Sequence, residues 1–231
     1  MEHILLLHGA IGAKDQLQGL SEKLSSTYNV HNISFSGHGG TPYSGAFSIK
    51  QFAEEVLAYV NSNGLDKVNI FGYSMGGYVG MYLARYYPER INKLVTLATK
   101  YHWDPAIAEK ENKMLDADVI ASKIPVFAAA LEKRHAPNNW KDLLLKTRDM
   151  LTAMGNDNPL RTEDYGLVNQ PILVLLGDRD KMVSLEEILQ VYKYLPNAQM
   201  GMLPGTAHPI EQVNNAYLTF LIKTFISEPS K

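Results

Sequence analysis

Residues 68–77 read Val-Asn-Ile-Phe-Gly-Tyr-Ser-Met-Gly-Gly, an apolar run that leads into the pentapeptide Gly-x-Ser-x-Gly. The run predicts a buried strand, and a helical pattern follows it up to Tyr87. A serine on a sharp turn from strand to helix has an exposed Oγ and lies among backbone N–H groups at a helix N-terminus. The small residues around it let the backbone turn and let the helix pack closely. Ser74 is therefore a candidate nucleophile.

Short apolar runs alternate with helical patterns along most of the chain. The runs are continuous, as is typical of strands buried on both faces of a parallel sheet. Four clear runs and two weaker ones predict strands at residues 4–7, 68–71, 94–98 and 171–176, and at 30–35 and 198–203. Helical patterns are found at residues 13–26, 48–61, 74–87, 184–195 and 211–227. The alternation predicts an α/β fold with a doubly wound, mainly parallel sheet.

Residues 101–168 break this alternation, because they contain helical patterns and no convincing strand. Helices are predicted at residues 106–118, 119–135 and 139–154. We interpret the region as a helical insertion after the strand that ends near Ala98. The remaining residues, 1–100 and 169–231, would then form one core domain.

Composition and charge exclude several classes of protein. Apolar residues make up 45% of the 231 residues and charged residues 20%, as in ordinary soluble domains. The net charge of −2 argues against binding to nucleic acid or to an anionic membrane. The absence of cysteine excludes disulfides, zinc–thiolate sites and a cysteine nucleophile. Without a signal-peptide pattern or a membrane span, we expect a cytoplasmic protein, monomeric or homodimeric, that acts on a small molecule.

A serine hydroxyl needs a general base, which is usually histidine. His208 is the best placed of the seven histidines, because it lies in a loop after the last predicted strand. Loops at the carboxyl ends of parallel strands carry the catalytic groups of such sheets. An imidazole with an ordinary pKa of about 6.5 can both take and return a proton near neutral pH. The competing interpretation is an ordinary surface histidine.

An acid that orients this histidine should also follow a strand. Gly177-Asp178-Arg179-Asp180 comes directly after the apolar run at residues 171–176 and offers two candidates. A carboxylate there would accept from the histidine N–H and stabilise the imidazolium. Asp178 could instead pair with Arg179 or cap the turn, so the residues alone leave the choice open.

An oxyanion needs two backbone N–H donors aimed at one point. Met75 supplies one candidate donor, because it follows Ser74 at the start of a helix. Ala10 supplies the other, within the glycine-containing loop at residues 7–12 that follows the first predicted strand. That loop could also hold a phosphate, but it does not match the Gly-x-Gly-x-x-Gly pattern of dinucleotide sites.

These motifs, taken in order, resemble the α/β-hydrolase superfamily with its Ser…Asp…His sequence order. The matching segments span almost the whole chain: His8-Gly9, Gly37-His38-Gly39-Gly40, residues 72–76, residues 177–180 and the loop around His208. The resemblance implies that the acid is Asp180 and that the fold lacks the family's first two strands, which leaves six. It also implies that residues 101–168 form a cap after the family's sixth strand. No metal or organic cofactor is implied.

The cap should shape the substrate pocket. Aromatic and methionine side chains there suit an apolar acyl or aryl group. The candidate pocket residues are Tyr101, His102, Trp103, Met114, Phe127, Trp140, Met150 and Met154. At helical spacing such residues more often form the core of the cap than the wall of a substrate pocket. Basic residues that could bind a substrate carboxylate are Lys133, Arg134, Arg148 and Arg161, although a solvated face is the simpler interpretation.

Three functions are consistent with this pattern. The first is a serine hydrolase that cleaves a carboxylic ester or thioester through an acyl-enzyme. The second keeps the same three side chains for another reaction, because the family includes C–C bond hydrolases, elimination enzymes similar to the menaquinone-pathway synthase, and perhydrolases. The third is a ligand receptor or signalling protein on the same fold, since fold alone does not determine function.

Overall fold

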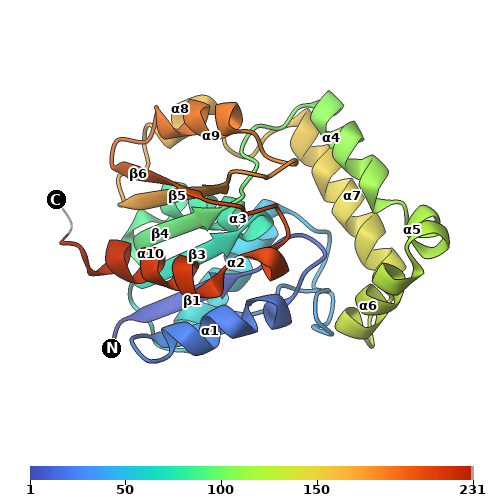
Figure 1. The fold of residues 1–231 in the computed structure, drawn as a ribbon, viewed down its shortest axis with the longest axis horizontal. Coiled ribbons are helices and arrows are strands. Elements are labelled where there is room, and N and C mark those ends of the chain that lie inside the picture. Colours follow the sequence, from blue (N-terminus) through green and yellow to red (C-terminus); the bar gives the residue numbers. More distant parts are fainter. Residues whose placement is uncertain (230–231) are drawn as a thin grey trace.

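The computed structural model describes residues 1–229, and its centre is a six-stranded sheet with helices on both faces (Figure 1). The strand order is β2-β1-β3-β4-β5-β6, and each neighbouring pair is parallel. The strands are β1 (His3–Leu7), β2 (Asn29–Ile33), β3 (Val68–Tyr73), β4 (Ile91–Leu97), β5 (Ile172–Gly177) and β6 (Ala198–Leu203). The predicted fold class is confirmed.

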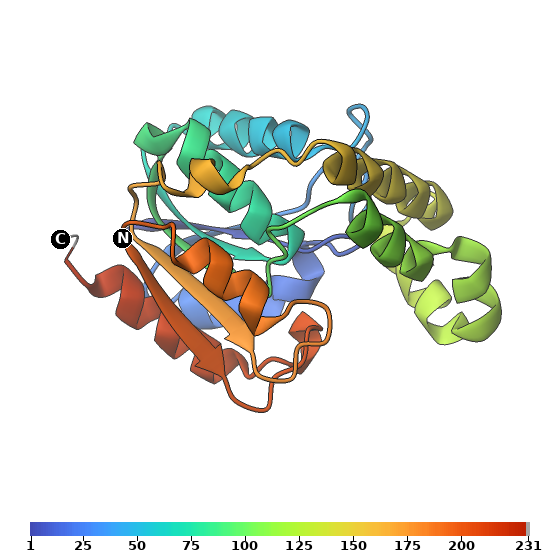
Figure 2. The ribbon, with the colours of Figure 1, turned by 90° about the horizontal axis from the view of Figure 1, so that it is seen from above.

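Two layers of helices bury the two faces of the sheet (Figure 2). One layer consists of α1 (Gln18–Leu24) and α10 (Asn215–Ser227), and the other of α2 (Ile49–Ser62), α3 (Met75–Tyr86) and α9 (Leu185–Tyr192). Successive residues of β1 alternate between the two cores, with Leu6 in one and Leu7 in the other, both fully buried. Burial on both faces explains why the strands have continuous apolar sequences.

Between β4 and β5 the chain forms only helical elements and loops. These helices are α4 (Pro105–Asn112), α5 (Ala117–Lys123), α6 (Pro125–His135), α7 (Trp140–Asn156) and α8 (Thr162–Tyr165). Helices α4 to α7, called the cap below, project to one side of the sheet (Figures 1 and 2). No helix among residues 1–229 is long and apolar enough to cross a membrane.

The helices between β4 and β5 differ from the prediction at three places. The predicted helix at residues 106–118 ends earlier, because α4 stops at Asn112 and α5 begins at Ala117. The predicted helix at residues 119–135 is divided into α5 and α6, because Ile124 precedes a proline and adopts a non-helical φ of −135° and ψ of 59°. Pro125 then begins α6, where its missing N–H costs nothing. Helix α8 was not predicted, since four residues are too short to show a helical period.

The order of the strands determines where a ligand can bind. The chain forms β1 and then the edge strand β2, and it returns to the other side of β1 to form β3. Such a reversal opens a crevice at the carboxyl ends of the two central strands. Leu7 pairs with Gly72 near these ends, so the loop at residues 9–12 lies beside the turn at Ser74.

Two buried histidines lie beneath the loops at this edge of the sheet. His8 donates from Nδ1 to the carbonyl of Gly9 (2.8 Å), and its Nε2 accepts from the amide of Phe35 (3.1 Å). Because an amide can only donate, Nε2 carries no proton and the ring is neutral. Burial lowers the pKa of His8 to about 4. His38 is also fully buried, and burial holds its pKa well below the ordinary value.

We predict that His8 makes the protein less stable in mild acid. Its pKa of about 4 lies below the value of about 6.5 in an unfolded chain, so the unfolded chain binds the proton more readily. The contribution of neutral His8 to the free energy of unfolding is therefore complete above about pH 6.5 and is lost as the pH falls toward about 4. Replacing His8 by Gln, whose amide oxygen can accept from Phe35, should flatten the stability profile over this range by about 1.4 kcal/mol per pH unit.

Urea unfolding of the wild type and of His8→Gln at a series of pH values measures this effect. The control is His102→Gln, which removes a histidine with an exposed side chain and should change the profile less than His8→Gln does. Parallel profiles for the wild type and His8→Gln would contradict the prediction.

Candidate active site

Ser74 lies on a strained turn between β3 and α3. Its φ of 52° and ψ of −116° are unusual for a residue with a side chain. The backbone around it is held on both sides: its amide donates to the carbonyl of Leu97 (2.9 Å), and its carbonyl accepts from the amide of Gly77 (3.0 Å) and from Oγ1 of Thr99 (3.1 Å). Such strain persists only where the surrounding structure holds the backbone in place.

The glycines of the pentapeptide allow this turn to pack against the sheet. A Cβ atom on Gly76 would lie 2.2 Å from the carbonyl oxygen of Leu7, and one on Gly72 would lie 2.4 Å from the carbonyl oxygen of Gly76. Both contacts are with backbone atoms, which cannot move aside as a flexible side chain can. The helix therefore begins directly against β1, and this is what places Ser74 at the end of the crevice.

His208 contacts Asp180 in the loops that follow β6 and β5. Nδ1 of His208 lies 2.8 Å from Oδ2 of Asp180, and Oδ1 of Asp180 accepts from the amides of Met182 (2.8 Å) and Val183 (2.9 Å). The Asp180 side chain is 1% exposed. Burial acts to raise the pKa of Asp180, but the hydrogen bond from His208 and those from the two amides outweigh it and lower the pKa.

Asp178, the other candidate acid, has a different environment. Its Oδ1 accepts from the amide of Thr206 (3.0 Å), and the amide of Arg179 donates to the carbonyl of Thr206 (3.0 Å). Asp178 therefore holds the loop that carries His208, whereas Asp180 contacts the ring itself.

Ser74 and His208 line one pocket between the sheet and the cap. Among residues 1–229 no hydrogen bond joins their side chains, and in sites without substrate such bonds are often long. Ala10 and Met75 line the same pocket, and their amides have no hydrogen-bond acceptor within the described part of the chain. The structure thus brings together a serine, a histidine that contacts a carboxylate, and two free backbone donors.

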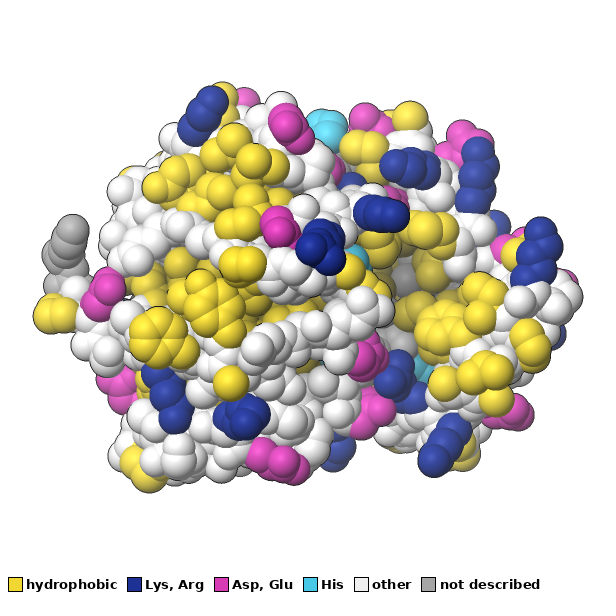
Figure 3. All heavy atoms as spheres, viewed as in Figure 1, with side chains coloured by type: hydrophobic (Ala, Val, Ile, Leu, Met, Phe, Trp, Pro, Cys, Tyr) yellow, Lys and Arg dark blue, Asp and Glu magenta, His cyan; other side chains and the backbone are white. Residues whose placement is uncertain are grey.

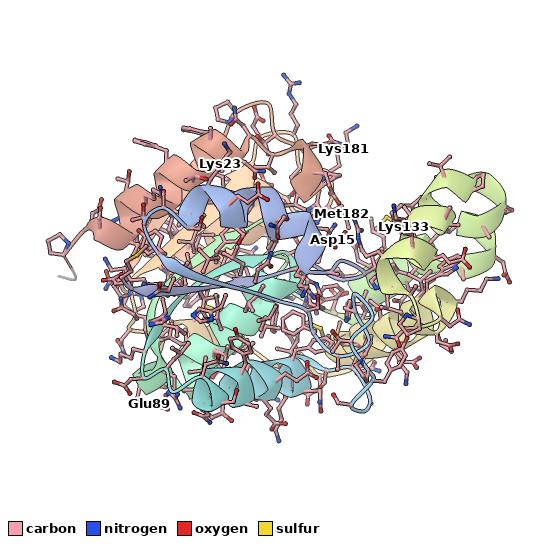
Figure 4. The ribbon with its side chains drawn as sticks, turned by 90° about the horizontal axis from the view of Figure 1, so that it is seen from below. Asp15, Lys23, Glu89, Lys133, Lys181 and Met182 are labelled. Carbon is pink, nitrogen blue, oxygen red and sulfur yellow. The ribbon has the colours of Figure 1, made fainter. Side chains whose placement is uncertain are left out.

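The pocket has a volume of about 370 Å³ and is lined mainly by apolar side chains. Figure 3 shows hydrophobic side chains gathered around a hollow between the core and the cap. Figure 4 labels Asp15 and Met182 at the edge of the core that faces the cap, with Lys133 on the cap. Five methionines contribute to the wall: Met75, Met114, Met150, Met154 and Met182.

The predicted pocket residues fall into two groups. The side chains at the pocket are Trp103, Met114, Phe127, Met150 and Met154. Three others lie elsewhere: Tyr101 is buried and donates to Thr96, His102 lies beside Asp104, and Trp140 packs inside the cap. Aromatic composition alone could not separate these groups, because it does not report which side of a helix faces the cleft.

Several pocket residues were not predicted. Tyr73 and Tyr78 flank Ser74 in sequence and line the pocket, and the Tyr73 hydroxyl also donates to the carbonyl of His208 (3.0 Å). The available signal was that Tyr73 lies within the Gly-x-Ser-x-Gly motif and Tyr78 two residues after it. Ile11 and Met182 also line the pocket, and they belong to the two loops that carry Ala10 and Asp180.

Arg134 is the predicted cap cation that reaches the pocket wall, and acidic side chains already pair with it. Its Nε lies 3.0 Å from Oδ2 of Asp15, and its Nη2 lies 3.5 Å from Oε1 of Glu211. Arg148 lies on a separate surface hollow, and Arg161 pairs with Asp157.

Lys100 is a second cation at the pocket, and it pairs with glutamates of α4 and α9. Its Nζ lies 3.0 Å from Oε1 of Glu187 and 3.8 Å from Oε1 of Glu111. Burial raises the pKa of Glu111, although Lys100 acts in the opposite direction. Within residues 1–229, no cluster of three or more His, Asp or Glu side chains is arranged to hold a metal ion.

Curated proteins similar to this chain include enzymes of two kinds. The chain is 26% identical to the pimeloyl-[acyl-carrier protein] methyl ester esterase of Citrobacter koseri, over 99% of this chain and 90% of that protein. It is also 26% identical to a protein of Bacillus subtilis provisionally named 2-succinyl-6-hydroxy-2,4-cyclohexadiene-1-carboxylate synthase, over 90% of this chain and 84% of that protein.

The fold is also similar to that of solved structures. A thermophilic esterase from Thermogutta terrifontis superposes with a TM-score of 0.78 at 22% identity, over 98% of this chain and 89% of that one. At this identity the likeness concerns the fold alone. The family model for the alpha/beta hydrolase fold matches residues 2–137, more than half of the chain. With the parallel sheet and the strained serine turn already established, the chain belongs to the alpha/beta hydrolase family.

Proposed function

We propose that the protein is a serine hydrolase that cleaves a carboxylic ester or thioester with a small to medium apolar acyl or aryl group. Ser74 would be the nucleophile, His208 the general base and Asp180 the acid that orients the histidine. The observation that carries the proposal is the 2.8 Å contact between His208 and Asp180 at a pocket that also contains the strained Ser74. The esterase names of related proteins agree with it.

In the first half-reaction, Nδ1–H of His208 donates to Asp180, which leaves Nε2 free to accept the proton of the Ser74 hydroxyl. The Ser74 oxygen forms a bond to the carbonyl carbon of the ester, and the carbonyl oxygen becomes negative. The amides of Ala10 and Met75 would stabilise this oxyanion. Nε2 then returns the proton to the leaving alcohol or thiol as the bond to it breaks, and the acyl group remains on Ser74.

In the second half-reaction, water replaces the alcohol. Nε2 of His208 takes a proton from the water, and the water oxygen attacks the acyl carbon through a second oxyanion held by the same amides. Collapse of this intermediate releases the carboxylic acid and returns the proton to Ser74. Throughout the cycle Asp180 remains ionised and stabilises the imidazolium, which its lowered pKa favours.

The pocket favours a neutral acyl group over a charged one. Its wall is mainly apolar, and its methionines are flexible side chains that adapt to different apolar shapes. Arg134 and Lys100 each lie near two carboxylates of the protein. A substrate carboxylate would have to displace these protein carboxylates in order to pair with either cation. An anionic group would therefore be desolvated without a free cation to pair with it.

The same three side chains could serve C–C bond hydrolysis, elimination or perhydrolysis, and the B. subtilis relative is the observation that favours such a reaction. Failure to cleave simple esters, with Ser74 still reactive toward a fluorophosphonate, would support that alternative. Ligand binding by Ser74→Ala that is coupled to contact with a partner would support a receptor.

We predict that Ser74→Ala abolishes the turnover of p-nitrophenyl esters and that Asp180→Asn lowers kcat by about 10³-fold to 10⁴-fold, because the histidine loses its orienting acid. Asp178→Asn is the matched control, since Asp178 lies in the same loop and binds a backbone amide rather than the ring. Its kcat should stay within about tenfold of the wild type. Unchanged turnover in Ser74→Ala, or equal losses in the two aspartate variants, would contradict the assignment.

We also predict that acyl chain length controls activity. Each added methylene that enters the apolar pocket should raise kcat/KM about fourfold, up to the length that fills about 370 Å³. The p-nitrophenyl esters of acetate, butyrate and hexanoate test this trend.

A matched pair of esters tests the preference for neutral acyl groups. The 4-methylpentanoate ester and the monosuccinate ester have nearly the same shape, but one ends in an isopropyl group and the other in a carboxylate. We expect kcat/KM for the charged ester to be lower by about a hundredfold. A preference for the charged ester that is lost in Arg134→Gln would instead support a carboxylate-bearing substrate.

A further inference from the structure

A histidine of the cap binds the loop that carries Ala10. His135 is the last residue of α6 and is fully buried. Its Nδ1 lies 3.0 Å from the amide nitrogen of Gly39, and its Nε2 lies 3.0 Å from the carbonyl oxygen of Ile11. The amide can only donate, so Nδ1 accepts and the ring proton is on Nε2. His135 is therefore a neutral bridge that accepts from one loop of the core and donates to another.

The loop that it contacts is strained. Residues 9–12 form a turn closed by a hydrogen bond from the amide of Gly12 to the carbonyl of Gly9 (3.1 Å). Ile11 is the third residue of this turn and has a φ of 52°. A positive φ at that position is normally provided by glycine, and it is a clear outlier for a β-branched residue. Strain of this kind is retained only where neighbouring groups hold the backbone.

The cap provides these neighbouring groups. The Ile11 side chain packs against both the main core and the apolar cluster within the cap. The Ile11 carbonyl is held by His135, and Ala10, whose amide is free within the described residues, directly precedes Ile11. The Ile11 carbonyl shares a peptide group with the Gly12 amide, and the Gly9 carbonyl that accepts from Gly12 shares one with the Ala10 N–H. A rotation of the peptide group after Ile11 would therefore break the hydrogen bond that closes the turn and release the peptide group that carries the Ala10 N–H.

We propose that His135 is a positioning residue for the oxyanion hole: by donating to the Ile11 carbonyl it keeps the turn at residues 9–12 in the conformation that aims the Ala10 amide into the pocket. The cap then contributes to stabilising the transition state as well as to forming the acyl pocket. The inference rests on the proposed function, because it gives the Ala10 amide a role in ester cleavage.

Two substitutions separate the two hydrogen bonds of His135. The amide nitrogen of His135→Gln can reach the position of Nε2 and still donate to Ile11, whereas the Gly39 amide loses its acceptor. The amide oxygen of His135→Asn can reach the position of Nδ1 and accept from Gly39, whereas the Ile11 carbonyl loses its donor. Each variant leaves one buried backbone group unpaired, so similar losses of stability are expected.

We expect His135→Asn to lower kcat for p-nitrophenyl butyrate by about tenfold to a hundredfold, a smaller loss than removal of an oxyanion donor. KM should change less than about threefold, and His135→Gln should retain kcat within about threefold of the wild type. Inhibition by a trifluoromethyl ketone, which forms an oxyanion on reaction with serine, should weaken in His135→Asn by the same factor as kcat/KM.

Asn138→Ala is the control for a general loosening of the cap. Asn138 donates to the carbonyls of Gly37 (3.1 Å) and Thr41 (2.7 Å), close to His135 but away from the Gly9–Gly12 turn. Its kcat and its inhibition should match those of the wild type. Equal kcat in the two His135 variants, or a kcat that follows the unfolding midpoint across all three variants, would overturn the inference.

One measurement needs no variant to fold. The nitrogen chemical shifts of His135 in the wild-type protein should report a proton on Nε2, and a proton on Nδ1 would refute the bridge.

The inference can also fail separately from the proposed function. Activity that survives Ser74→Ala refutes the proposed function, whereas activity that requires Ser74 but is equal in the two His135 variants refutes only the role of His135.

Discussion

The left-handed backbone of Ser74 is the constraint on which the site depends. A φ of 52° turns the chain from β3 into α3 at a single residue. The new helix packs directly against the neighbouring strand at Gly76, where a Cβ atom would lie only 2.2 Å from the carbonyl oxygen of Leu7. Nothing larger than a hydrogen atom fits there. The turn is therefore held between β1 and β3 at the centre of the sheet, and its strain is offset by the packing of the core.

The rest of the site is arranged around that turn by the topology of the sheet. The reversal of strand order at β1 places the Gly9–Gly12 turn beside Ser74, and the loops after β5 and β6 meet through the contact between Asp180 and His208. The cap contacts the core at two places. Residues of α7 such as Met150 belong to the main core, and His135 of α6 binds the strained Ile11. Core and cap thus form one structure around a shared apolar pocket, which is why we propose that the cap influences both acyl selection and the oxyanion donors.

The sequence predicts the core better than the cap, and the reason is physical. Strands buried on both faces must be continuously apolar, so 4–7 and 171–176 are evident without a structure, and Gly-x-Ser-x-Gly identifies a turn that few other residues can form. The acid could not be chosen from the residues alone, because Asp178 and Asp180 both follow β5, and only the fold shows that Asp178 binds the Thr206 amide whereas Asp180 contacts the His208 ring. In the cap, amphipathic helices pack against each other as well as against the cleft, so Trp140 and Phe127 could not be distinguished by sequence. A lone buried histidine such as His135 carries no sequence signal.

The central claim is that the side chain of Ser74 is the one that becomes acylated. The most direct test is to titrate the protein with a fluorophosphonate, follow esterase activity during the titration, and locate the adduct by peptide mass spectrometry. The account predicts one adduct per chain, on Ser74, with activity lost in proportion to labelling. An adduct on a different residue, or full esterase activity in protein whose Ser74 is completely labelled, would contradict it.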